Sequence, residues 1–386
     1  MKIRSMPSLK ALKGKRILLR LDLNVPVSGS KISDDFKIIS ALPTIRQLRS
    51  EPLIIISHRG EPTTKNGKYT YNSSYSLQPV ALRIKKYLGG KVFIAKGSWT
   101  ELKKQSDLLQ PGDIMVLENL RFWPGEVSND KTFAQNLASL AHVYINDAFA
   151  VSHRSHASVV AITKYIPSYA GPLLQQEIKN LSKVFDERSL VVILGGAKIS
   201  SKLPLIKKLL PRASAIIMGG GLANTLLKVR GKNIGASLYD ANTLTAAKRL
   251  TSKKIMLPID VVVQNGKKIT IKSISEVQTK EKILDLGPMT LLKYDAVIAK
   301  AKNIIWNGPI GLFENKNFQK GTKQIIQSIQ KAHRKKSFSL AGGGETVEAI
   351  RMLKAEDSFS WVSTGGGASL IFLSGEAMPG LKGLID

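Results

Sequence analysis

Two lysines, Lys198 and Lys202, follow a pair of glycines in the stretch LGGAKISSKL, which spans residues 194–203. If a helix starts at this turn, lysines four positions apart share one of its faces, and both ammonium groups lie over whatever the glycines hold. Glycine lets backbone N–H groups approach a ligand closely, so the combination is typical of a polyphosphate site. The turn matches neither the GxxxxGK[ST] phosphate loop nor the GxGxxG dinucleotide fingerprint, so a nucleotide here would be bound by another scheme.

Further glycine-bearing turns follow apolar runs in the same half of the chain. They read MGGGLANT, WNGPIGLFE, AGGGETV and STGGGAS. Each turn alone is more often structural than phosphate-binding, because glycine is common where a strand passes into a helix. Together on one edge of a sheet, they indicate a rim of backbone N–H groups and helix N-termini that attracts negative charge.

Polar side chains of another kind follow the apolar runs of the first half. They are Asp22 and Asn24 in RLDLNVP, His58 and Arg59 in ISHRGEP, Arg121 in ENLRF and Arg154 in NDAFAVSHRSH. Arginines beside a hydrogen-bonding Asp/Asn pair suit a small acid that carries phosphate and hydroxyl groups. Each arginine taken singly is more often a surface ion pair, but their common position after apolar runs favours a binding site.

The elements that position these residues are predicted by the apolar runs themselves. Short runs rich in Ile, Val and Leu recur from KRILLRLDL to FSWVSTGGG, separated by segments of helix length. This pattern predicts α/β architecture with two doubly wound, Rossmann-like parallel sheets, each covered by helices on both faces. Ligands bind such sheets outside the carboxyl ends of the strands. In VVVQNGKKITI, the pair Asn265-Gly266 predicts a β-hairpin.

Composition narrows the class of protein. A chain of 386 residues is too long for one ordinary core and predicts two domains. The absence of cysteine excludes disulfides, thiolate metal sites and cysteine nucleophiles. His153 and His156 have a metal-like spacing without a companion carboxylate cluster, which favours a positioning or core role. No signal peptide or apolar run of bilayer length is evident, so we expect a cytoplasmic protein that does not enter a membrane.

The net charge of +30 raises the question of nucleic acid. Nucleic-acid modules usually concentrate their cations in one patch or arm, often between aromatic residues. Here lysine and arginine are spread over both halves of the chain and aromatic residues make up only 6%. The charge therefore favours a lysine-rich solvated surface, with no specific nucleic-acid partner, over weak RNA or membrane adhesion.

Taken together and in order, these motifs resemble the phosphoglycerate kinase family across essentially the whole chain. The matching stretches are KRILLRLDLNVP, ISDDFKIISALPTI, VLENLRF, YINDAFAVSHRSHAS, LGGAKISSKLPLI, MGGGLANT, LPIDVVV, LGPMT, WNGPIGLFE, AGGGET and STGGGASL. The resemblance implies a monomeric glycolytic kinase that reversibly converts 1,3-bisphosphoglycerate and Mg-ADP to 3-phosphoglycerate and Mg-ATP. Mg²⁺ is the implied cofactor, and ATP or ADP is the implied nucleotide substrate.

The resemblance also implies a division of labour between two domains that close about a hinge. Residues 1–168 with 376–386 would bind the phosphoglycerate, and residues 187–375 would bind the nucleotide. Between them, the stretch YIPSYAGP precedes a helical pattern in which Leu174, Ile178 and Leu181 share one face. We expect residues 169–186 to form this interdomain helix.

Position by position, the resemblance assigns roles to individual residues. Those implied to bind the phosphoglycerate are Asp22, Asn24, His58, Arg121 and Arg154. Those implied to act in phosphoryl transfer are Lys37, Lys198, Lys202, Gly365 and Gly366. Those implied to bind the nucleotide are Lys202, Gly219, Gly220, Asn307, Pro309, Gly311, Glu314, Gly342, Gly343, Gly344, Glu345 and Thr346. Glu345 stands where the family usually has an aspartate near the metal, so it is the expected metal ligand.

Two departures from the family pattern lie in the phosphoglycerate site. Lys37 replaces an arginine that steadies the phosphoryl group in flight; it keeps the charge but loses the planar fork, which predicts slower transfer. The family's SHxGRP is SHRGEP here, with Glu61 in place of the arginine. Our hypothesis is that Arg59 supplies the missing cation and binds substrate while Glu61 turns outward, because residues two apart in an extended loop point the same way.

Other departures are Ser201 for an aspartate, Ala150 for a glycine and Gln176 for a lysine. The chemistry itself needs no general base, because the nucleophile is an ionised phosphate or carboxylate oxygen. Catalysis then rests on alignment and charge neutralisation. Two alternatives remain: a related small-molecule kinase with another acid substrate, and a nucleotide-binding protein, RNA-associated through its charge, that has lost catalysis.

Overall fold

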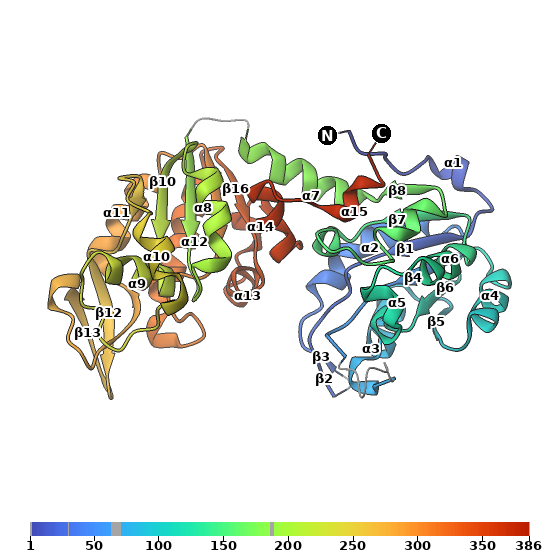
Figure 1. Cartoon of the computed structure of the whole chain (residues 1–386), viewed down its shortest axis with the longest axis horizontal. Coiled ribbons are helices and arrows are strands. Elements are labelled where there is room, and N and C mark those ends of the chain that lie inside the picture. The colour runs from blue at the N-terminus through green and yellow to red at the C-terminus, as the bar shows by residue number, and fades with distance from the viewer. Residues whose placement is uncertain (1, 30, 63–70, 186–188, 386) are drawn as a thin grey trace. The chain divides into compact units, whose positions relative to one another are not determined.

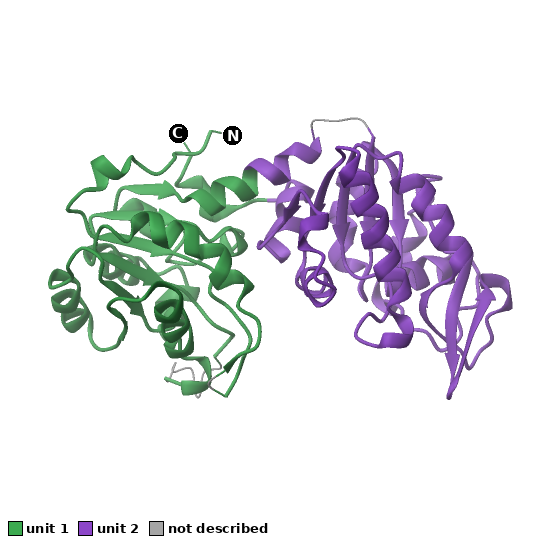
Figure 2. Cartoon of the chain, turned by 180° about the vertical axis from the view of Figure 1, so that it is seen from behind, with its two compact units in different colours: residues 1–178, 377–386 green, residues 179–376 purple. Residues whose placement is uncertain are grey.

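The computed structural model describes residues 2–29, 31–62, 71–185 and 189–385. The chain divides into two compact units, drawn in different colours in Figure 2. Unit 1 comprises Met1–Ile178 and Ala377–Asp386, and unit 2 comprises Lys179–Glu376. The division falls within the helix α7 (Pro172–Ser182). The domain boundary expected at residues 186 and 187 lies outside the described residues.

Unit 1 is built on a six-stranded parallel sheet in the order β5-β6-β4-β1-β7-β8. In chain order the strands are β1 (Ile17–Arg20), β4 (Leu53–Ile56), β5 (Val92–Ala95), β6 (Ile114–Leu117), β7 (Val143–Asn146) and β8 (Ser168–Ala170). In β1, Ile17 and Leu19 pack into one core while Leu18 packs into another on the opposite face. Successive side chains of a strand alternate between faces, so a continuous apolar run is what a sheet buried on both sides requires.

Helices cover both faces of this sheet, as Figure 1 shows. The principal ones are α2 (Phe36–Leu48), α3 (Gln78–Leu88), α4 (Trp99–Asp107) and α6 (Lys131–Ser139), with the short α1 (Leu9–Leu12), α5 (Pro124–Val127) and α15 (Pro379–Lys382). The helix α4 begins with a capping box between Ser98 and Glu101. A small hairpin pairs β2 (Val27–Ser28) with β3 (Lys31–Ile32). The two ends of the chain pair within this unit, since Arg4 N–H donates to Leu384 O at 2.7 Å.

Unit 2 contains a second six-stranded parallel sheet in the order β11-β10-β9-β15-β16-β17. Its strands are β9 (Leu190–Leu194), β10 (Ala213–Met218), β11 (Ile255–Met256), β15 (Asn303–Asn307), β16 (Phe338–Ala341) and β17 (Trp361–Val362). Its helices are α8 (Leu203–Leu209), α9 (Gly220–Val229), α10 (Leu244–Lys248), α11 (Pro288–Ile298), α12 (Lys320–Arg334), α13 (Gly344–Met352) and α14 (Gly367–Ser374). Two doubly wound parallel sheets confirm the predicted fold class.

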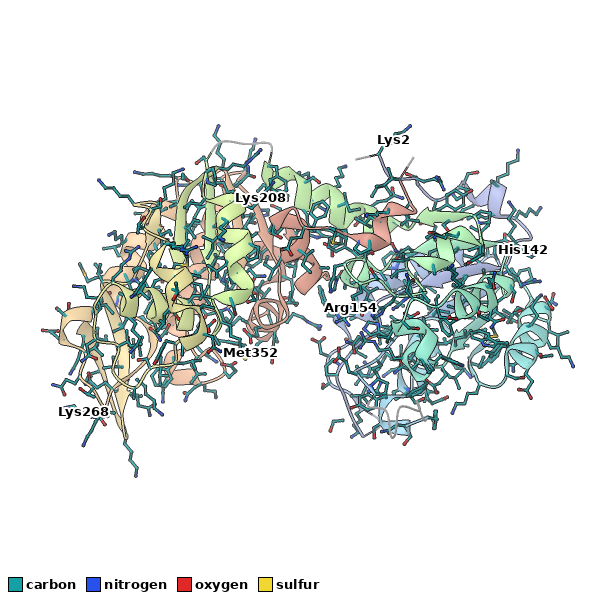
Figure 3. The ribbon with its side chains drawn as sticks, in the orientation of Figure 1. Lys2, His142, Arg154, Lys208, Lys268 and Met352 are labelled. Atoms are coloured by element: carbon teal, nitrogen blue, oxygen red, sulfur yellow. The ribbon has the colours of Figure 1, made fainter. Side chains whose placement is uncertain are left out.

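Unit 2 also carries a three-stranded antiparallel sheet in the order β13-β12-β14, with its own small core. The strands are β12 (Asp260–Asn265), β13 (Lys268–Ser273) and β14 (Lys282–Leu286). The predicted hairpin at Asn265-Gly266 is confirmed, because Asn265 pairs with Lys268 and Gly266 has a φ of 57°. Figure 3 labels Lys268 at the end of this hairpin. Across the described residues, no helix combines the length and the apolar character needed to cross a membrane.

Candidate active site

A cavity of unit 2 lies where the order of its sheet reverses. The chain winds outward from β9 to β10 on one side and from β15 to β16 on the other, so β9 and β15 flank the switch point of the sheet. A cavity of about 430 Å³ lies beyond the carboxyl ends of these two strands. Its lining residues are Gly195, Gly196, Ala197, Lys198, Ser201, Lys202, Asn307, Gly308, Gly343, Gly344, Glu345, Thr346, Gly366, Gly367 and Leu370.

Close backbone packing explains the glycines of this rim. A Cβ atom at Gly195 would lie 1.9 Å from Pro309 O, so the turn after β9 packs directly on the turn after β15. Gly343 has a φ of 100°, and a Cβ there would lie 2.7 Å from Asn307 Nδ2. A larger residue at Gly195 is excluded by the steric clash. At Gly343 it is excluded both by a clash and by the positive φ.

Two helix N-termini reach the same cavity. The helix α13 begins at Gly344 and α14 at Gly367, and the glycines on both sides of each start line the cavity. The free N–H groups and the dipole at such ends favour negative charge. Gly365 is engaged differently, because its N–H donates to Ser363 Oγ at 3.1 Å.

Lys198 and Lys202 both line the cavity, but they do not share a helical face as the sequence had suggested. Ser200–Lys202 forms a 3-10 turn, and α8 begins only at Leu203, with Pro204 in its first turn. The Lys202 ammonium donates to Asn307 Oδ1. Burial lowers the pKa of Lys202 to about 8, although the Glu345 carboxylate acts in the opposite direction. A half-buried cation thus lies among glycine N–H groups.

A second cavity, of about 200 Å³, adjoins the first and shares Gly196, Ala197 and Glu345 with it. Apolar side chains dominate its walls: Leu238, Ile283, Leu284, Leu286, Pro309, Ile310 and Leu312. Gly220, Gly221, Gly311, Asn224, Asp285 and the exposed Glu314 also line it. An apolar slot beside a glycine-lined anion cavity suits a flat ring that carries phosphates.

The unit 2 residues predicted to bind the nucleotide or to act in phosphoryl transfer therefore fall, apart from Gly365, into two groups. Those that line one of the cavities are Lys198, Lys202, Gly220, Asn307, Pro309, Gly311, Glu314, Gly343, Gly344, Glu345, Thr346 and Gly366. Gly219 and Gly342 lie behind them, where their N–H groups donate to Leu194 O and Trp306 O in the sheet. Gly342 O in turn accepts a hydrogen bond of 2.6 Å from Asn307 Nδ2, so it helps to hold the partner of Lys202.

Unit 1 gathers charged side chains at the carboxyl ends of its own strands. Asp22 and Asn24 follow β1, and Asn24 Oδ1 accepts a hydrogen bond of 2.9 Å from Gly60 N–H after β4. Lys37, in the first turn of α2, donates to Asp22 Oδ2 at 2.6 Å. The two loops and the helix start are thus held together by polar contacts.

His58 lies buried beneath this cluster, with Nδ1 3.3 Å from Arg20 Nη2. Burial holds the pKa of His58 well below its usual range, and nearby cations lower it further. Those cations are Arg20, Arg121, Lys37 and Arg154. The imidazole is therefore neutral at physiological pH, in the middle of a strongly basic site.

Arg121 and Arg154 reach the site from the segments after β6 and β7; Figure 3 labels Arg154. The Arg121 guanidinium is buried and donates to Gly60 O at 2.6 Å. Glu61 Oε1 lies 3.4 Å from Arg121 Nη1 and 3.7 Å from Arg154 Nη1. Glu61 thus faces these arginines, although its side chain is largely exposed.

Arg59 points away from this group. Its side chain is buried, Nε donates to Ser76 O at 3.0 Å, and Nη2 donates to Ser74 O. Its backbone N–H is bound by Asn119 Oδ1, which also accepts from the Arg121 N–H. The structure therefore does not bring the Arg59 guanidinium together with Arg121 and Arg154.

Sequence reasoning missed a buried layer of charge below the site. Arg20, at the end of β1, is fully buried and donates to Ser158 Oγ at 3.0 Å; its Nη2 lies 4.0 Å from Glu126 Oε1. Burial would raise the pKa of Glu126, but contacts with His156, Arg20 and Ser158 hold it below its usual value. The signal was present, since an arginine ending an apolar strand has to find a buried partner.

The residues of the site can hold Mg²⁺ only if the substrate phosphates supply further ligands to the ion. Within the described residues, no group of three or more His, Asp or Glu side chains could hold a metal by itself, and His153 and His156 form no such group. Glu345 offers one exposed carboxylate beside the anion cavity. Mg²⁺ is commonly held by one or two carboxylates together with substrate phosphates, so this arrangement fits.

Comparison with known proteins gives one consistent result. The family model for phosphoglycerate kinase matches residues 8–376. The phosphoglycerate kinases of Herpetosiphon aurantiacus and Dictyoglomus turgidum are each 39% identical to this chain, over 97% of it and 97% and 96% of their own lengths. The structure of phosphoglycerate kinase from Coxiella burnetii aligns with a TM-score of 0.86 at 36% identity, covering 99% of this chain and 98% of that one.

Proposed function

The chain belongs to the phosphoglycerate kinase family, and from that premise we propose the following residue roles for its reaction. The enzyme is a kinase that transfers a phosphoryl group reversibly between 1,3-bisphosphoglycerate and ADP, giving 3-phosphoglycerate and ATP. The observation that carries the assignment of roles is the cavity at the switch point between β9 and β15, where glycine N–H groups, two helix N-termini and Lys202 surround one space.

In unit 2 we propose that the apolar slot takes the adenine ring and that Glu314 binds the ribose hydroxyls. The phosphates would lie in the adjoining glycine-lined cavity, against the starts of α13 and α14. Lys198 and Lys202 neutralise the charge that spreads over the transferred group. Glu345 would hold Mg²⁺ together with the phosphates, and the ion would supply charge neutralisation on the phosphate oxygens.

In unit 1 we propose that Arg121 and Arg154 bind the anionic groups of the phosphoglycerate, while Asp22 and Asn24 accept and orient its hydroxyl. Lys37 would face the transferred group with a point charge in place of a planar fork. His58 is neutral, so it can act as a hydrogen-bonding group without adding a repulsive charge. Different units would thus bind the two substrates, and hinge bending of the chain would bring the substrates together for transfer.

Steady-state turnover tests this assignment. Purified protein is given 3-phosphoglycerate and Mg-ATP, and a coupled dehydrogenase removes the product. We expect saturable turnover in both substrates, from a monomer in gel filtration. Binding of Mg-ADP without any turnover would contradict the proposal and indicate a nucleotide-binding protein that has lost catalysis.

A further inference from the structure

An exposed carboxylate lies against the two arginines that the proposed function assigns to the phosphoglycerate. Glu61 Oε1 is 3.4 Å from Arg121 Nη1 and 3.7 Å from Arg154 Nη1. The Glu61 side chain is 79% exposed, so burial does not force it into this position. Attraction by the two guanidinium groups is the physical reason for the contact.

The charges around His58 can be paired one by one. Arg20 has Glu126 at 4.0 Å, and Lys37 has Asp22 at 2.6 Å. The Glu126 and Asp22 side chains are buried, being 0% and 9% exposed, so a ligand cannot readily displace them. Glu61 is the remaining carboxylate of this set and the most exposed one. An incoming anion would therefore exchange with Glu61 rather than with the other two.

Arg121 shows that this position is suited to a larger acceptor than one carboxylate oxygen. Its Nη1 donates to Gly60 O at 2.6 Å, but its buried Nε has no hydrogen-bond partner among the described residues. Buried guanidinium N–H groups are normally satisfied. A phosphate group has three acceptor oxygens and more charge than a carboxylate, so it can bind the Arg121 and Arg154 guanidinium groups more strongly than Glu61 does.

We propose that Glu61 is an intramolecular competitor for the anionic group of the phosphoglycerate, an inference that rests on the proposed function. In the free enzyme Glu61 occupies Arg121 and Arg154, and the substrate displaces it on binding. Displacement costs part of the binding energy of the phosphorylated acid. Glu61 thereby sets the affinity of this site without entering the phosphoryl transfer itself.

The test compares the full-length protein with its Glu61→Gln variant, which keeps the shape of the side chain and removes the charge. Calorimetric titration with 3-phosphoglycerate, without nucleotide, measures the Kd directly, and steady-state kinetics measure KM and kcat. We expect Kd and KM for 3-phosphoglycerate to fall about two- to fivefold, the modest range of an exposed ion pair. The kcat and the KM for Mg-ATP should change less than twofold.

Two matched variants separate this effect from a general change of charge. Asp357→Asn also removes one exposed carboxylate, but in unit 2 and outside the residues of either cavity, so its Kd for 3-phosphoglycerate should equal that of the wild type. Glu61→Asp keeps the charge at the site, so its Kd should lie closer to that of the wild type than to that of Glu61→Gln.

The outcomes distinguish this inference from the function on which it rests. A wild type that turns over normally and a Glu61→Gln variant with an unchanged or higher Kd would overturn the competitor role alone. A fall in Kd of equal size in Asp357→Asn would overturn it as well, because bulk charge would then be the cause. A wild type that neither binds nor converts 3-phosphoglycerate would overturn both.

Discussion

The two units offer contrasting surfaces to anions. In unit 2 the cavity is lined mainly by glycines and by the starts of α13 and α14, with Lys198 and Lys202 as its cations. In unit 1 the site consists of charged side chains, and carboxylates oppose Arg20, Lys37, Arg121 and Arg154. The first depends on backbone shape, and the second on the balance of side-chain charge.

This difference predicts which positions can accept another side chain. A Cβ atom at Gly195 would lie 1.9 Å from Pro309 O, so even the smallest side chain at this position would distort the backbone site. In unit 1, Lys37 holds Asp22 at 2.6 Å with a partly exposed side chain, so another cation could stand at this position without a steric conflict. A charge-based site thus tolerates substitution and responds with altered affinity, whereas a backbone-based site keeps its residues or loses its shape.

The strongest test of this comparison removes the half-buried cation of the backbone site, Lys202. Lys202→Met should lower kcat about 10²- to 10³-fold, because charge on the moving phosphoryl group loses its neutralisation by a partly desolvated cation. Steady-state kinetics at saturating substrates measure the loss. The variant should keep the melting temperature of the wild type or exceed it, since it removes a desolvated charge. A kcat within fivefold of wild type would show that the glycine N–H groups alone suffice to neutralise the charge on the phosphoryl group.

Removing the corresponding cation of unit 1 should have a smaller effect. Lys37 is partly exposed and paired with Asp22, so its charge is already partly screened. We expect Lys37→Ala to lower kcat about 10- to 100-fold, and Lys37→Arg to raise kcat, because the planar fork can hold two oxygens at once. The pair of variants is measured at saturating 3-phosphoglycerate and Mg-ATP. Equal rates in all three proteins would contradict a role of residue 37 in transfer.

The affinity for ADP should depend on pH through Lys202 in the unit 2 site. The pKa of Lys202 is about 8, below the 10.5 of an ordinary lysine, so its ammonium is charged below pH 8 and neutral above it. Phosphate groups favour the charged form; ADP affinity should therefore be full below pH 8 and fall about tenfold by pH 9. Calorimetric titration with Mg-ADP at pH 7 and pH 9 measures this fall.

The lowered pKa of Lys202 affects the stability of the free protein in the opposite direction from its effect on ADP binding. Between pH 8 and pH 10.5 the unfolded chain holds a proton on Lys202 that the folded chain has released, so the contribution of Lys202 to stability rises with pH over that window. Lys202→Met should abolish both trends. A pH-independent Kd for ADP in the wild type would contradict the assignment of Lys202 to the phosphates.

Much of the fold was predictable because buried parallel strands leave a plain trace in sequence. The apolar runs from KRILLRLDL onward became strands of two sheets, and Asn265-Gly266 formed its hairpin. The glycine turns were also predictable, because few residues other than glycine fit where two backbone segments lie in close contact. The start of α8 was not, because a 3-10 turn at Ser200–Lys202 intervenes and α8 begins only at Leu203, with Pro204 in its first turn.

Side-chain directions in unit 1 were the least predictable. In SHRGEP we expected Arg59 to point toward the substrate and supply the cation missing at position 61, and Glu61 to point outward. In the structure Glu61 approaches Arg121 and Arg154, while Arg59 bonds two backbone carbonyls. Sequence spacing does not reveal which carbonyl groups a long side chain will find. The position of Arg20 at the end of an apolar strand did signal a buried partner, but it did not identify that partner as Glu126.

The smallest expected kinetic effect belongs to Arg59, and it decides whether every arginine near the unit 1 site serves the substrate. Because the Arg59 guanidinium binds Ser74 O and Ser76 O, Arg59→Met should leave the KM for 3-phosphoglycerate within twofold. Losing bonds from a buried charged group should instead lower the free energy of unfolding by about 1–3 kcal/mol, measured by urea denaturation. A severalfold rise in KM at unchanged stability would mean that Arg59 turns to the substrate on binding, and that this site is organised by the ligand rather than by its own hydrogen bonds.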